Sequence, residues 1–264
     1  MIMTQQQLAE NTNFVDIGTL PSYSEPYTEK KTFVRPMSVL DLRQVSKARA
    51  LNDYDYMLRM LNACTSRTVS PTDCHDNLTI GDFYFLLMWE KLNSTPKAPY
   101  TVDWTCQAEV RVLSSGERLP NDGTVPDCGQ HTTAVCDAQM SEIVHFSDIE
   151  IISLEPEKFF GLPSAVGEVE FDFPRVNVLT ALREAMLDPE LEYIARAAQW
   201  VKGGSLADKI ALLERQPNLD AFYTCQVLEK TVVHGIAESC VLTCRVCLKK
   251  YAHTFKTDPM SFFL

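Results

Sequence analysis

The spacing of apolar residues predicts three helices in the first hundred residues of the chain. Apolar side chains recur at helical intervals over 38–50 and 53–63, and Ser38 has the residue type of an N-cap. A third helix is expected to begin at Thr79, with Asp82 as the acidic partner of a capping box. Its body, FYFLLMWEKL, is apolar nearly all round, which is typical of a buried helix. We therefore expect buried side chains at Phe83, Leu86, Leu87 and Trp89.

Beyond residue 100 the pattern changes to β-branched and aromatic residues, which favour strands. Strands are expected over 100–113, 132–154 and 168–173. Helical spacing returns over 176–187, 191–202, 206–216 (with a capping box at Ser205 and Asp208) and 217–233, and AESCVLTCRVCLKKYAHTF has the pattern of a hairpin. This order of elements predicts an α+β fold, in which helical blocks are each followed by a small β hairpin or sheet carrying a Cys-centred turn.

The chain is expected to consist of an arm and two α+β domains. Residues 1–30 begin with a Gln- and Asn-rich stretch, and two prolines then enforce an extended path, so this segment is predicted to be an extended N-terminal arm. The first domain is assigned to 31–156 and the second, with the C-terminal Cys hairpin, to 157–264. In the stretch KTFVRPMSVLDL, Arg35 is expected either beside a carboxylate or at the surface as a solvated charge.

Charge and hydropathy exclude some classes of partner. The 264 residues carry 24 basic and 35 acidic side chains, a net charge of −11, whereas nucleic acid and anionic membranes attract clustered Lys and Arg. No apolar run approaches the length of a membrane span, and the polar N-terminus lacks the pattern of a secretory signal. We therefore expect a protein that stays in the cytoplasm where it is made, with reduced cysteines that favour metal binding over disulfides.

The clearest local motif is Cys244-Arg-Val-Cys247, which lies between two strand-like runs. A C-x-x-C turn brings two thiolates to one side and supplies half of a tetrahedral zinc site. Two alternatives stay open at this point. The cysteines are buried free thiols in one of them, because Cys packs as a small hydrophobe. In the other, the spacing of Cys240, Cys244 and Cys247 makes them the core stripe of a helix.

A second candidate site comes from the segment DCGQHTTAVCD. Cys128 and His131 form a C-x-x-H turn, Cys136 follows, and Cys106 ends the strand before it, so the four together supply a closed zinc site. A mixed site of Cys128, His131, Cys244 and Cys247 is the alternative. Either version is expected to be structural, because neither leaves an open coordination position beside a base. The other cysteines, Cys64, Cys74, Cys225 and Cys240, are taken as thiols.

Catalytic motifs are absent from the sequence. It contains no phosphate-binding loop, dinucleotide-binding glycine pattern, nucleophile elbow or HExxH zinc motif. A thiol hydrolase built on Cys74 and His75, or on His234, is the enzymatic alternative, but neighbouring residues in sequence do not by themselves place a base beside a nucleophile. We therefore expect a protein that is not an enzyme.

Several segments, taken in order, resemble the T-even phage baseplate protein family. TLPSYSEPY, FVRPMSVLDL, LNACTS and LTIGDFYFLLMWEKLNSTPKAPYTVDWTC follow the family's order of a Leu-Pro-Ser arm, a strand ending in Arg-Pro, helices and an extended segment that runs into cysteines. The matching residues are Leu20, Pro21, Ser22, Arg35, Pro36, Leu78, Asp82 and Cys106. The resemblance covers roughly residues 19–136, and the C-terminal half matches mainly through HGI at 234–236 and the Cys244/Cys247 turn. The insertion between Cys106 and Cys128 departs from the pattern.

The resemblance implies a structural or assembly role in the hub region of the tail baseplate of a contractile-tailed phage. The implied partners are other baseplate, tail-tube or tape-measure proteins, bound by protein–protein docking and with several copies in each assembly. The implied location is the virion, after assembly in the host cytoplasm. An assembly chaperone that leaves before the virion is complete is the first alternative, and a cytoplasmic zinc or thiol enzyme is the second.

Overall fold

The computed structural model describes residues 14–22, 26–27, 31–41, 43, 61, 65–66, 77–94, 100–121, 131–155, 157, 163–237 and 239–254. The chain forms two compact units, each built from separate stretches of sequence. Unit 1 comprises 1–94, 151–236 and 258–264, and unit 2 comprises 95–150 and 237–257. The units are interleaved along the chain, which differs from the consecutive domains 31–156 and 157–264 predicted above. The cause is that the C-terminal hairpin packs with the strands of 100–143 and not with the helices that precede it.

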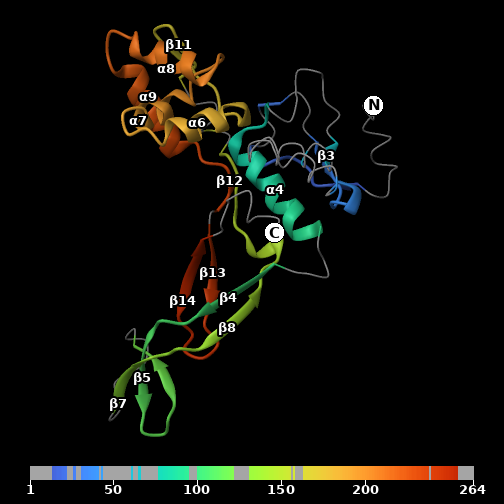
Figure 1. The fold of residues 1–264 in the computed structure, drawn as a ribbon, viewed down its shortest axis with the longest axis vertical. Helices are drawn as coiled ribbons and strands as arrows, with labels where there is room; N and C mark the ends of the chain where they lie inside the picture. Colours follow the sequence, from blue (N-terminus) through green and yellow to red (C-terminus); the bar gives the residue numbers. More distant parts are fainter. Residues whose placement is uncertain are drawn as a thin grey trace. The chain divides into compact units, whose positions relative to one another are not determined.

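The fold class is α+β, as the pattern of elements predicts. Helices and several small antiparallel sheets alternate along the described residues (Figure 1). Of the first two predicted helices, 39–41 and residues 43 and 61 are helical, and the remainder of 38–50 and 53–63 lies outside the described residues. The Ser38 capping box is present, since the Ser38 N–H donates to the Asp41 carboxylate and the Asp41 N–H donates to Ser38 Oγ.

The central helix of unit 1 is α4, Ile80–Ser94. Its residues Phe83, Leu86 and Leu87 are fully buried and Trp89 is nearly so, which confirms the predicted core helix. Thr79 caps its N-terminus by accepting the N–H of Asp82 on Oγ1 at 3.3 Å. The Asp82 carboxylate does not complete the predicted box, because it accepts from Ser22 and Tyr27 while the Thr79 N–H donates to Tyr27 Oη.

The described part of the predicted N-terminal arm is packed into unit 1 and does not extend away from it. Ser22 and Tyr27 are buried, and both donate hydrogen bonds to the Asp82 carboxylate, from Ser22 N, Ser22 Oγ and Tyr27 Oη at 3.0, 2.6 and 2.7 Å. Tyr27 Oη also accepts the N–H of Thr79 at 2.8 Å. Burial and the neighbouring Asp82 raise the pKa of Tyr27 well above its ordinary value. The segment therefore supplies hydrogen-bond partners to the buried polar groups at the N-terminus of α4.

A small antiparallel sheet joins this segment to the rest of unit 1. It consists of β1 (Val15–Asp16), β2 (Phe33–Val34) and β3 (Thr65–Ser66), with β2 between the other two. Directly after β2, Arg35 forms two hydrogen bonds with the Asp41 carboxylate at 2.7 and 2.9 Å, so the carboxylate alternative for Arg35 is confirmed. The guanidinium holds the pKa of Asp41 down to about 2. This ion pair fixes the turn from the strand into the first helical residues.

The second half of unit 1 is a group of short helices around one apolar core. The elements are β10 (Ala165–Val166), β11 (Val169–Glu170), η3 (Val176–Val178), α6 (Leu179–Ala185), α7 (Glu192–Ala198), α8 (Leu206–Glu214) and α9 (Asp220–Thr231). Each helix falls within its predicted segment but is shorter at one or both ends. The Ser205 capping box at α8 is present in both directions. Leu206, Leu213, Cys225 and Leu228 contribute to a continuous buried cluster between these helices.

A close backbone contact joins the two halves of unit 1. The short strands β9 (Ile151–Ile152) and β12 (Gly235–Ile236) pair, and β12 also packs against α4. A Cβ atom placed on Gly81 would lie 2.3 Å from the carbonyl oxygen of His234, and one on Gly235 would lie 2.8 Å from Gly81 Cα. Both positions therefore require glycine. Thr79 Oγ1 and His234 Nε2 form a hydrogen bond of 2.8 Å beside this contact.

Unit 2 consists of two antiparallel ribbons. The first contains β4 (Thr101–Thr105), β5 (Glu109–Leu113), β6 (Arg118–Pro120), β7 (His131–Val135) and β8 (Gln139–Ile143), followed by η2 (Phe146–Asp148). β4 pairs with β8, and β5 pairs with both β6 and β7. The second ribbon is the predicted C-terminal hairpin, β13 (Ser239–Thr243) and β14 (Lys250–Thr254). The helical alternative for the Cys240, Cys244 and Cys247 stripe is thereby wrong.

Candidate metal centre

The first ribbon positions Cys106 and Cys136 at a break in its pairing. β4 continues into β5 through 106–108, and β7 continues into β8 through 136–138, so both strands are interrupted at the same level (Figure 1). Backbone hydrogen bonds cross the break: the Cys106 N–H donates to Ala138 O at 2.9 Å, and the Cys136 N–H donates to Ala108 O at 2.8 Å. These reciprocal bonds hold the two cysteines opposite each other and pair both of their backbone N–H groups.

The second ribbon presents the other two cysteines on its connecting loop. Cys244 N–H donates to Lys249 O, and Leu248 N–H donates to Cys244 O, both at 2.9 Å, which closes the loop tightly. The backbone N–H of Val246 points to Cys244 Sγ at 3.4 Å. An amide directed at sulfur stabilises a thiolate, so the loop suits a charged ligand at Cys244.

Two non-glycine residues with left-handed backbone flank this cluster. Asp137 follows Cys136 with φ 51°, and Leu248 follows Cys247 with φ 61°. This region is uncommon for residues with a Cβ, and it persists where the surrounding structure requires it. In both places the left-handed residue directly follows a cysteine of the cluster.

The four sulfur atoms converge on one point. The Sγ atoms of Cys106, Cys136, Cys244 and Cys247 all lie within 4.8 Å of one another. Cys106 Sγ lies 3.6 Å from Cys247 Sγ, and Cys136 Sγ lies 3.9 Å from Cys244 Sγ. Four thiolates around a tetrahedral zinc, at about 2.3 Å from the metal, would stand about 3.8 Å apart. The observed separations fit that geometry and exceed the roughly 2 Å of a disulfide bond.

The cluster is buried and surrounded by apolar and aromatic side chains. Cys106, Cys136 and Cys244 are fully buried and Cys247 is 1% exposed. Trp104 and Tyr251 pack together at 4.9 Å between ring centroids, and both contact the cluster. Tyr251 Oη lies 3.2 Å from Cys106 Sγ, within hydrogen-bond range. A bound metal would therefore be shielded from water, and Tyr251 would orient one of its ligands.

The pKa values of three of these thiols are shifted in different directions. Burial opposes the ionisation of Cys106, but the hydrogen bond with Tyr251 and the neighbouring amide and thiols lower its pKa to about 7. Burial raises the pKa of Cys247 to about 12, and it also raises that of Cys136. Cys106 therefore ionises more readily than Cys136 or Cys247, and a cation in the centre would allow the four cysteines to be thiolates together.

These contacts define a site that could hold a metal ion with four cysteine ligands. Four protein ligands fill a tetrahedral site, so no coordination position remains for a substrate. The cluster combines one cysteine from each strand of the first ribbon with both from the loop of the second. A metal there would join two ribbons that are far apart in sequence.

The predicted ligands divide into those that meet here and those that do not. Cys106, Cys136, Cys244 and Cys247 come together, whereas the prediction grouped them in two separate sites or paired the last two with Cys128 and His131. His131 begins β7 opposite Leu113 and is not among the four converging residues. Cys128 lies outside the described residues, as do Cys64 and Cys74. Cys225 and Cys240 are buried free thiols outside the cluster, as predicted.

A short repeat in the sequence could have identified the correct set. Cys106 occurs in TCQAEV and Cys136 in VCDAQM, so each begins a Cys-x-Ala tripeptide at the end of a strand. The alanine of each tripeptide accepts the N–H of the other cysteine. The repeat therefore marks two equivalent positions of one ribbon, which the C-x-x-H spacing of Cys128 and His131 obscured.

Comparison with protein-family models, with curated proteins and with solved structures finds no match to this chain. Among the described residues, no helix has the length and apolar character needed to cross a membrane.

Proposed function

We propose that unit 2 is a structural zinc module, and that the protein acts by docking to other proteins rather than by catalysis. The observation that carries the proposal is the convergence of four buried sulfur atoms within 4.8 Å. Sites with four thiolates in tetrahedral geometry bind zinc or iron, and closed zinc sites of this kind are structural. Zinc is the metal we assign, because it has no redox chemistry and needs only the four ligands.

The assignment is tested by metal analysis of matched variants. Purified protein with reduced thiols should contain one zinc per chain and no iron. Cys244→Ser and Cys136→Ser, one from each ribbon, should both lose the metal. Cys240→Ser is the matched control, because Cys240 is a buried thiol of the same hairpin and is not part of the cluster. Retention of zinc by both cluster variants, or iron in place of zinc in the parent protein, would overturn the assignment.

We further propose that the protein is a component of a contractile phage tail and docks in the hub region of the baseplate. The support is the order of sequence segments from TLPSYSEPY to the first cysteine strand. A docking protein also needs exposed apolar surface. Leu219, Tyr223 and Val227 supply it, because they follow one another at helical spacing at α9 and are 57, 56 and 57% exposed.

The docking proposal is tested by the composition of purified tails. The chain should be present in mature particles of the phage that encodes it, and Tyr223→Glu should reduce its incorporation while the free protein stays folded. Presence in assembly intermediates but not in mature particles would favour the alternative of an assembly chaperone. Absence from both would contradict a role in the tail.

A cytoplasmic zinc or thiol enzyme is the remaining alternative. It requires a cavity where a Cys, a His and a carboxylate converge. Among the described residues, the metal cluster contains cysteines alone, and a polar cavity of unit 1 beside Arg175 and Lys209 is lined by neither Cys nor His. Both observations support a binding role over a catalytic one.

A further inference from the structure

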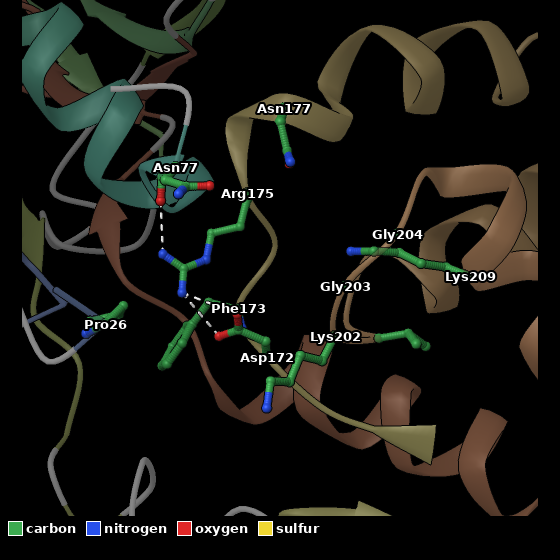
Figure 2. Close-up of a pocket in the computed structure, with 11 residues that line it drawn as sticks. Pro26, Asn77, Asp172, Phe173, Arg175, Asn177, Lys202, Gly203, Gly204 and Lys209 are labelled. Atoms are coloured by element: carbon green, nitrogen blue, oxygen red, sulfur yellow. Dashed lines mark hydrogen bonds and ion pairs between the residues drawn. The ribbon is translucent and has the colours of Figure 1, made fainter. Parts of the chain in front are cut away.

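Unit 1 contains a polar cavity of about 350 Å³ that the docking role does not use. Its walls come from the loop of Asp172 to Asn177, from the turn at Val201 to Gly204, and from α8 through Lys209 (Figure 2). Three segments of unit 1 that are separated in sequence therefore surround one space, and the cationic side chains Arg175, Lys202 and Lys209 all line it.

Lys209 is the unusual member of this lining. It is only 6% exposed, and Figure 2 shows its side chain extending from α8 so that its amino group ends in the space between the glycine turn and Arg175. The amino group forms no hydrogen bond or ion pair with any described residue. Burial lowers the pKa of Lys209, and the negative charge of Asp172 acts in the opposite direction. A buried cation of this kind is costly unless an anion compensates it.

The anions near the cavity already have other partners. Asp172 accepts two hydrogen bonds of 3.1 Å from Arg175, whose other terminal nitrogen donates to Asn77 O at 2.7 Å. Lys202 pairs with Glu170 at 2.7 Å. Asp172 and Glu170 thus each have a cationic partner, whereas Lys209 forms no ion pair with a described residue, which favours an anion in the cavity.

The remaining wall leaves room for a ligand close to the backbone. Gly203 and Gly204 have φ of 73° and 69°, where side chains are disfavoured, and a Cβ on Gly203 would meet no atom within 4 Å. The N-terminus of α8 is already capped by Ser205 and Asp208, so it does not itself provide the site. On the opposite wall, Asn177 is exposed and its amide points into the cavity (Figure 2).

We propose that this cavity binds the phosphate group of a small molecule, with Lys209 Nζ as the main contact and the Asn177 amide as a second. The groups lie on different walls, which suits the tetrahedral array of phosphate oxygens better than the planar pair of a carboxylate. Arg175 positions the loop and supports the positive potential without leaving Asp172. The cavity is large enough for further atoms beyond the phosphate.

The test is calorimetric titration of the full chain with pyrophosphate and with inorganic phosphate, using citrate to represent carboxylates. Lys209→Met, which keeps the length and apolar stem of the side chain, should weaken pyrophosphate binding by about tenfold or more, because a charge-assisted contact is lost. Asn177→Asp lies at the surface, where folding is not at risk, and should also weaken binding because it places a carboxylate in the cavity. Lys230→Met is the control, since it removes an exposed lysine from α9 in the same unit.

The outcomes separate cleanly. Binding that both cavity variants lose and Lys230→Met retains supports the site. The site would be overturned if Lys209→Met or Asn177→Asp bound pyrophosphate with unchanged affinity, or if Lys230→Met lost as much affinity as they do. It would also be overturned if neither phosphate probe showed saturable binding. Tighter binding of citrate than of pyrophosphate would overturn the assignment of phosphate. None of these results depends on zinc in unit 2 or on docking to a phage tail.

Discussion

The two units use buried cysteine in opposite ways. In unit 1, Cys225 is one member of a cluster of fifteen buried residues, most of them Leu, Val, Ala and aromatic side chains. Burial raises its pKa to about 12, so it remains a neutral thiol that packs as a hydrophobe. In unit 2, four of the five buried residues of the cluster that joins its two ribbons are cysteines, and Val110 is the fifth.

This contrast indicates which interactions stabilise each unit. Unit 1 buries large apolar side chains, including the nearly complete circumference of α4, and this is an ordinary hydrophobic core. The cluster that joins the ribbons of unit 2 has five buried residues, against fifteen in the helical core of unit 1. Small domains with too few buried side chains need a metal or covalent links to be stable. The comparison therefore leads us to assign the stability of unit 2 to its metal site and that of unit 1 to packing.

The largest effect is expected from Cys247→Ser. Metal binding and folding are one free energy in small zinc domains, on the order of 10 kcal/mol, so the loss of one ligand should unfold the junction of the two ribbons. The measurement is the near-ultraviolet circular dichroism of Trp104 and Tyr251, which pack against the cluster, together with the metal content. A variant that keeps both signals would mean that unit 2, like unit 1, is stabilised by packing and not by a metal.

A core substitution in unit 1 is expected to have the next largest effect. Leu87→Ala removes a fully buried side chain of α4 and should lower the free energy of unfolding of unit 1 by about 2–5 kcal/mol. Its metal content should remain that of the parent protein. Denaturant unfolding and metal analysis of the same preparation check both parts. A change below about 0.5 kcal/mol would mean that this side of α4 is not a core face.

The buried hydroxyl of Tyr27 tests whether the start of the chain belongs to unit 1. Tyr27→Phe removes a donor to Asp82 and the acceptor of the Thr79 N–H, and it should destabilise unit 1 by about 1–3 kcal/mol. Tyr100→Phe is a control outside this unit. Equal and negligible changes in the two variants would mean that the contacts of Tyr27 do not hold the start of the chain in unit 1.

The smallest effect is expected at the helix cap of α8. Ser205→Ala removes the acceptor of the Asp208 N–H and should cost about 1 kcal/mol of unit 1 stability. Ser205→Asp, which restores a capping oxygen, should recover most of it. Thermal unfolding of the two variants distinguishes them, and a loss that Asp does not restore would show that the cap is not the cause.

Local patterns in the sequence were sufficient to predict most of the helices and strands and many of the buried residues. The apolar run of α4 predicts its burial, and the residues at Ser38 and Ser205 predict helix starts, because periodicity and capping act within a few residues. The hairpin around Cys244 and Cys247 follows from the same kind of local signal.

Long-range pairing was not predictable in this way. The C-terminal hairpin packs with a ribbon more than a hundred residues earlier, so the division into units and the ligand set both depend on contacts that local patterns do not encode. His131 illustrates the limit, because its spacing from Cys128 suits a metal turn, while its strand position opposite Leu113 lies outside the cluster. The packing of Ser22 and Tyr27 against Asp82 was missed for the same reason.

The most direct test of a metal-held unit 2 is amide hydrogen exchange of the full chain with and without its metal. After removal of the metal by a chelator under reducing conditions, we expect protection to be lost over 101–113, 131–143 and 239–254, while α4 and α6 to α9 keep theirs. Restoring zinc should restore the protection. Unchanged protection of the two ribbons in the metal-free protein would show that the metal does not stabilise unit 2, and the four cysteines would then be ordinary core residues like Cys225.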